Sequence, residues 1–131
     1  MHKAAVTTGA AMTSSISTLV FDVGETLVDE TGMWAGWARY LGVTLEAFLA
    51  ELDLAISEGR HHRTVFARLR PGFDLARARA EREGRGERLI FTAADLYPDA
   101  QPALRDLRAR GIRIGIAGNQ PQASEAALRE A

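Results

Sequence analysis

Two short apolar runs, each followed by a glycine, constrain the fold of this chain most strongly. Residues 17–23 read Ser-Thr-Leu-Val-Phe-Asp-Val before Gly24, and residues 112–117 read Ile-Arg-Ile-Gly-Ile-Ala before Gly118. Short apolar runs rich in branched side chains are typical of strands buried in a sheet. Helical spacing fills much of the sequence between them, and such a strand–crossover–strand order predicts parallel pairing with a right-handed connection.

The sequence between the two runs is longer than a crossover requires, and its periodicity predicts several helices. Apolar spacing and glycine or proline stops indicate helices at 33–41, 45–56, 64–70 and 74–83. Thr44 is the expected N-cap of the second helix, and Asp99 that of a later helix with Pro102 in its first turn. A last helix is expected over 121–131. These elements predict an α/β core with an inserted, mostly helical cap.

The expected organisation has three parts. Residues 1–16 carry small and polar residues without an apolar signal core, and are expected to form a disordered tail. Residues 17–31 together with 93–131 are expected to form an α/β core, which two strands alone leave incomplete. Residues 32–92 are expected to form the helical cap.

Composition excludes several classes of function. A length of 131 residues is that of one domain, and the 47% hydrophobic and 25% charged fractions are typical of a soluble globular protein. The absence of cysteine excludes disulfides and thiolate metal sites. A net charge of -1 gives no indication of a nucleic-acid partner. No apolar stretch reaches the length of a membrane span, so we expect no membrane partner and a cytoplasmic protein. The oligomeric state stays open.

The residues that follow the first run resemble a known motif. Phe-Asp-Val-Gly-Glu-Thr-Leu, at 21–27, is similar to the first motif of the haloacid dehalogenase (HAD) superfamily, in which an apolar strand precedes Asp, any residue, usually Asp, then Gly, Thr and Leu. Asp22, Thr26 and Leu27 match at the right spacing. The region 96–119 is similar to the second motif of the family. The resemblance implies part of a Rossmann-like parallel sheet, a HAD-like core, with the helical cap between the two motifs.

The resemblance also implies a reaction and a site. It implies Mg²⁺-dependent hydrolysis of a phosphate ester through an aspartyl intermediate on Asp22, with a small phosphorylated or other anionic molecule as substrate. Asp22 would be both the catalytic nucleophile and a metal ligand, and the carbonyl of Gly24 a second ligand. Gly118 and Asn119 would bind phosphate. A carboxylate at the carboxyl end of a strand suits this chemistry, because ligands of open α/β sheets bind at that end.

The sequence departs from the family pattern in three places that matter for activity. Gly24 stands where phosphatases of the family carry the aspartate that protonates the leaving group, and Glu25 is a candidate substitute. Gly118 stands where the family has Ser or Thr. The third and fourth motifs lie beyond the end of the chain, so we expect a fragment of a longer protein or a degraded relative. Residues 1–131 alone are expected to turn over generic phosphate esters negligibly, and a catalytically inactive binding remnant is the alternative.

Several other features of the sequence have more than one interpretation. Residues 22–26 also fit the Asp-x-Gly-x-Thr phosphate loop of the actin–sugar kinase superfamily, although a helical pattern follows in place of a second strand. The basic stretch 60–88, which includes His61 and His62, is interpreted as a solvated helical face, with attraction of an anionic substrate as the alternative. Trp34 and Trp37 are expected in the core of the cap.

Overall fold

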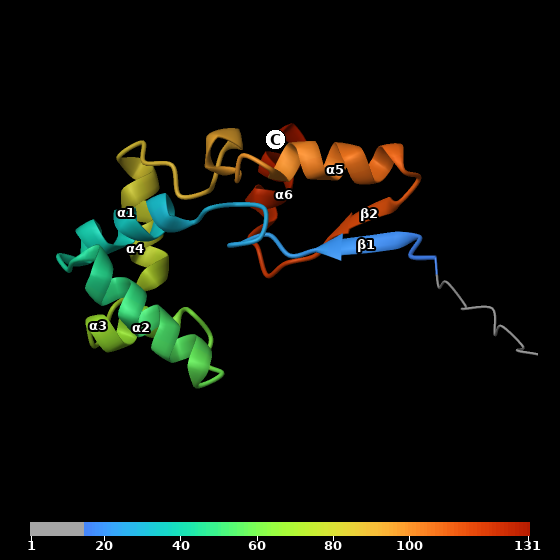
Figure 1. Ribbon diagram of the computed structural model, residues 1–131. Coiled ribbons are helices and arrows are strands. Elements are labelled where there is room, and N and C mark those ends of the chain that lie inside the picture. Colours follow the sequence, from blue (N-terminus) through green and yellow to red (C-terminus); the bar gives the residue numbers. More distant parts are fainter. Residues whose placement is uncertain (1–14) are drawn as a thin grey trace, which may run out of the picture.

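A computed structural model describes residues 15–131 of the protein, so nearly all of the tail expected at 1–16 lies outside the described residues (Figure 1). Strand β1 (Thr18–Phe21) pairs in parallel with β2 (Arg113–Ile116). Leu19 lies opposite Ile114 in this register. The predicted parallel pairing is therefore confirmed, and the chain has the expected α/β character.

Both strands are shorter than the apolar runs that predicted them. After Asp22 the chain turns sharply, and the Val23 carbonyl accepts hydrogen bonds from the N–H groups of Thr26, Leu27 and Val28 at 2.9–3.3 Å. This turn leads toward a helix, and the one strand paired with β1 in residues 15–131 is β2. The loop at 22–26 does not join two strands of a hairpin, which contradicts its interpretation as a sugar-kinase phosphate loop.

Four helices follow the turn, and local sequence explains where they begin and end. They are α1 (Thr31–Leu41), α2 (Leu45–Ser57), α3 (Thr64–Leu69) and α4 (Leu75–Gly84). Thr44 caps α2 as predicted, because its side chain accepts a hydrogen bond from the Ala47 N–H at 3.1 Å. Asp74 caps α4 in the same way. Gly42 ends α1 in the left-handed conformation, with φ of 72°.

The helices α1 to α4 enclose an aromatic core. Trp34 stacks on Phe48 with ring centroids 5.5 Å apart, and Trp37 meets the edge of Phe66 at 5.0 Å. Trp37 is 2% exposed and Phe48 fully buried. The two tryptophans therefore serve as core residues of this segment, as the sequence indicated.

The rest of the chain returns to the sheet through a short 3-10 helix, η1 (Ala93–Asp95), and then α5 (Ala100–Ala109) before β2, and ends in α6 (Gln122–Glu130). In Figure 1, α5 runs alongside the two strands. The Asp99 residue precedes α5 as predicted, but its side chain makes no capping hydrogen bond. That part of the prediction is wrong, because Asp99 has helical backbone angles.

A second apolar cluster holds these elements together and shares no residue with the aromatic core. Its buried members include Val23, Val28, Phe91 and Ala127. Phe91 lies within the range 32–92 predicted for the cap, yet it packs with this cluster. The division of the chain into core and cap stays a prediction.

The sheet itself is only partly covered. The side chains of Val20 and Ile116 are 65% and 45% exposed, as expected of two strands without further neighbours. None of the described helices is long and apolar enough to cross a membrane.

Candidate functional site at the carboxyl ends of the strands

Asp22 is the first residue after β1, and its side chain is exposed. Its Oδ1 atom accepts a hydrogen bond from the Val23 N–H at 2.8 Å. No other hydrogen bond reaches this carboxylate from residues 15–131, so Oδ2 has no protein donor there. A carboxylate held by one oxygen and exposed through the other is suited to attack an electrophile or to bind a cation.

The two sequence motifs meet beside Asp22 because the strands are parallel and their carboxyl ends share one edge. A Cβ placed on Gly118 would lie 3.3 Å from Oδ1 of Asp22 and 3.1 Å from Cγ2 of Val23. A serine or threonine at this position would therefore press on Val23. Asn119 is exposed, and its side chain makes no hydrogen bond within the described residues. At this edge, the backbone N–H groups of Gly118 and Asn119 donate to no acceptor in residues 15–131 and are therefore available to an anion.

Gly24 faces a carboxylate that the sequence did not single out. A Cβ on Gly24 would lie 2.7 Å from the carboxyl carbon of Glu30 and within 2.8 Å of both its oxygens. The half-buried Glu30 side chain thus takes the space in which a side chain at position 24 would begin. Burial is the main cause that raises the pKa of Glu30, and repulsion from Glu25 and Asp22 adds to it, while the Gln120 amide opposes the shift.

The contacts of Glu25 keep it from serving as the substitute proton donor. Its backbone is left-handed, with φ of 56°. One carboxylate oxygen accepts from the Glu30 N–H at 2.9 Å and the other from the Tyr97 hydroxyl at 2.8 Å. The hydrogen bond to Glu25 is the main cause that raises the pKa of Tyr97 to about 12. With both oxygens engaged in this way, Glu25 ties the loop to Tyr97 and is not free to protonate a leaving group.

Asp22, Glu25 and Glu30 make this end of the sheet acidic, and a phosphate ester would be repelled unless a cation were also bound. In residues 15–131 no three His, Asp or Glu side chains lie close enough together to form a metal site. The open Oδ2 of Asp22 is an oxygen ligand of the kind that Mg²⁺ takes, and Mg²⁺ often takes one or two protein ligands, keeps several waters and adds substrate oxygens.

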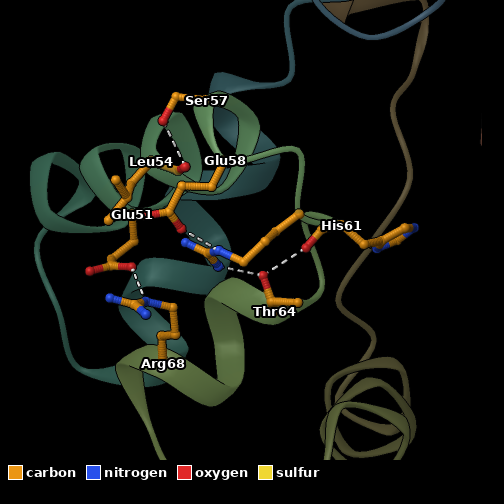
Figure 2. A network of polar contacts seen from close by, with 8 residues as sticks. Glu51, Leu54, Ser57, Glu58, His61, Thr64 and Arg68 are labelled. Carbon is orange, nitrogen blue, oxygen red and sulfur yellow. Dashed lines mark hydrogen bonds and ion pairs between the residues drawn. The ribbon is translucent and has the colours of Figure 1, made fainter.

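Some arginines of the basic stretch 60–88 form ion pairs and hydrogen bonds with neighbouring residues of the helical segment. Figure 2 shows the polar contacts that join α2 to the turn before α3 and to α3 itself. Arg60 pairs with Glu58 at 2.5 Å and donates to the Thr64 hydroxyl at 2.8 Å. Arg68 pairs with Glu51 at 2.8 Å. These contacts support the interpretation of this part of the stretch as a helical surface.

Comparison with known proteins agrees with the motifs. The family model described as "Hydrolase: haloacid dehalogenase-like hydrolase" matches residues 16–131. No curated protein and no solved structure matches the chain.

Proposed function

The chain belongs to the haloacid dehalogenase-like hydrolase family, and on that premise we propose that it hydrolyses phosphate esters through a covalent intermediate on Asp22, with Mg²⁺ as cofactor. The observation that carries the proposal is the placement of Asp22. Its carboxylate is exposed directly beyond β1, beside Gly118, and one oxygen has no protein donor in residues 15–131. The substrate would be a small phosphorylated molecule.

In the proposed reaction, Oδ2 of Asp22 attacks phosphorus and the ester P–O bond breaks. The alcohol leaves after it gains a proton from solvent, and an acyl phosphate remains on Asp22. Water then attacks that phosphorus, inorganic phosphate is released and the carboxylate is restored. The unpaired N–H groups of Gly118 and Asn119 would hold phosphate oxygens during both steps.

Asp22 and the Gly24 carbonyl would hold the metal. Bound Mg²⁺ would offset the repulsion between the acidic site and the phosphate and would polarise the phosphoryl oxygens. The acidic surroundings of Asp22, apparent in its repulsion of Glu30, support the requirement for a cation.

The proposal predicts a strong dependence on the leaving group. Gly24 supplies no proton donor and both oxygens of Glu25 are engaged, and general acid catalysis is worth about 10²–10⁴-fold. Hydrolysis of alkyl phosphates is therefore expected to be negligible. Para-nitrophenyl phosphate, whose leaving group needs little protonation, is the exception to the negligible turnover expected of generic phosphate esters, and it is expected to react slowly.

The test is hydrolysis of both ester types with and without Mg²⁺, by the wild type and by Asp22→Asn. Asp99→Asn is the matched control, because Asp99 is also an exposed aspartate without a side-chain capping bond. Metal-dependent hydrolysis of the aryl ester that disappears only in Asp22→Asn supports the proposal. Hydrolysis that persists in Asp22→Asn contradicts it.

A non-catalytic binding role is the second candidate, and Gly24 and Gly118 favour it. Neither glycine carries a side-chain donor, while the N–H groups of Gly118 and Asn119 donate to no acceptor in residues 15–131, which would suit anion binding. Phosphate binding that shifts the N–H resonances of Gly118 and Asn119, without hydrolysis of either ester, would identify this role.

A further inference from the structure

A cavity of about 240 Å³ lies between α1 and the end of α4, and Asp22 is not among the residues that line it. Three arginines line it: Arg39, Arg82 and Arg88. Its one acidic side chain, Glu87, is paired with Arg82 at 2.6 Å. Arg39 and Arg88 make no ion pair within residues 15–131. The lining therefore carries a formal excess of two positive charges.

Arg82 is the buried arginine that lines this cavity. It is 5% exposed, and its guanidinium lies over the Trp37 ring with Cζ 4.3 Å from the centroid. Only Nε has a hydrogen-bond partner among the described residues, and Nη1 is buried with none. A guanidinium carries five N–H donors, and leaving buried donors unpaired is costly. Arg82 also lines the positively charged cavity, and its Nη2 donates no hydrogen bond among the described residues.

The sequence of α1 leaves room for this arrangement. Gly36, in the middle of the helix, lies against the guanidinium, and a Cβ there would come within 2.8 Å of Nη2 of Arg82. Glycine in a helix interior costs about 1 kcal/mol relative to alanine. At this position the glycine allows the guanidinium to reach the cavity.

We propose that this cavity binds the phosphate group of a small molecule. A phosphate monoester is largely dianionic at neutral pH and would balance the two excess charges. Guanidinium groups match phosphate oxygens in geometry and form charge-assisted hydrogen bonds with them. The volume is below the roughly 300 Å³ at which pockets for drug-sized ligands begin, so little more than the phosphate is enclosed. The proposal does not rest on the proposed function, because Asp22 does not line the cavity.

The test is titration of the full chain with inorganic phosphate at constant ionic strength, followed by tryptophan fluorescence and calorimetry. Trp37 reports on the site because Arg82 lies on its ring. Acetate is titrated in parallel to distinguish a phosphate site from a general anion site. Asp22→Asn is included so that failure at the proposed catalytic site is distinguished from failure here.

Two variants perturb the site, one by removing two exposed charges and the other by displacing the buried Arg82 guanidinium. Arg39→Gln/Arg88→Gln changes two exposed residues, and Gly36→Ala pushes the guanidinium aside while favouring the helix. The charge-matched control is Arg110→Gln/Arg129→Gln, since both arginines are exposed and paired only with helical neighbours.

Saturable phosphate binding is expected in the wild type, in Asp22→Asn and in the control. It should be weaker by about tenfold or more in both site variants, because hydrogen bonds to charged groups are lost. Three results would overturn the proposal: no saturable signal, equal affinity for acetate, or unchanged binding in the site variants.

Discussion

Gly24→Ala is expected to destabilise the protein only while the Glu30 carboxylate is present. The added Cβ would lie 2.7 Å from the carboxyl carbon of Glu30, so the carboxylate must leave its half-buried place. Overpacking costs about 1–3 kcal/mol, and the low end applies here because the end of a flexible side chain can move. Gly24 does not have a left-handed backbone. In Glu30→Ala the same substitution should therefore be neutral or stabilise by about 0.4–1 kcal/mol, through a less flexible unfolded chain.

The assay is a double-mutant cycle by urea denaturation, followed by far-ultraviolet circular dichroism. The wild type, Gly24→Ala, Glu30→Ala and the double variant are compared. The two positions should couple by about 1–2 kcal/mol, with Gly24→Ala losing its destabilising effect in the Glu30→Ala background. Equal effects in both backgrounds would refute the idea that Glu30 occupies the space beside Gly24.

Three further predictions follow from particular contacts. Phe48→Ala should cost about 3–5 kcal/mol, because it empties the centre of the aromatic core, and tryptophan fluorescence should show this. Thr44→Ala should cost about 1 kcal/mol in urea denaturation and Asp99→Ala distinctly less, because only Thr44 makes a capping bond. The Tyr97–Glu25 contact should stabilise the fold fully below pH 10, the ordinary pKa of tyrosine, and this contribution should be lost as the pH rises toward the raised pKa of about 12. Tyrosinate absorbance should follow the shift, and Glu25→Gln should lower this pKa.

Much of the fold was predictable because its signals are local. The two apolar runs predicted both strands, and helical spacing with Thr44 and the glycine stops predicted α1 to α4. The meeting of Asp22 with Gly118 followed from parallel pairing alone. The family match over residues 16–131 then agreed with the motif at 21–27.

What the sequence did not predict depends on contacts between distant residues. Glu25 and Tyr97 are separated by 72 positions, and their hydrogen bond decides which way the Glu25 carboxylate points. Glu30 carried no motif, and the one signal for it was the missing side chain at Gly24. The sequence predicted that Arg82 belongs to a charged surface, whereas tertiary packing places its guanidinium over the Trp37 ring.

The central claim is that Asp22 is the nucleophile, and the most direct measurement is the position of a captured phosphoryl group. The chain is incubated with acetyl phosphate and Mg²⁺, the acyl phosphate is fixed by borohydride reduction, and its peptide is identified by mass spectrometry. Acetate needs no proton to leave, so the absence of a donor at Gly24 does not limit this step. We expect a single modification, at Asp22, that is absent in Asp22→Asn and retained in Asp99→Asn. An unmodified wild type, or a modification that persists in Asp22→Asn, would contradict the account.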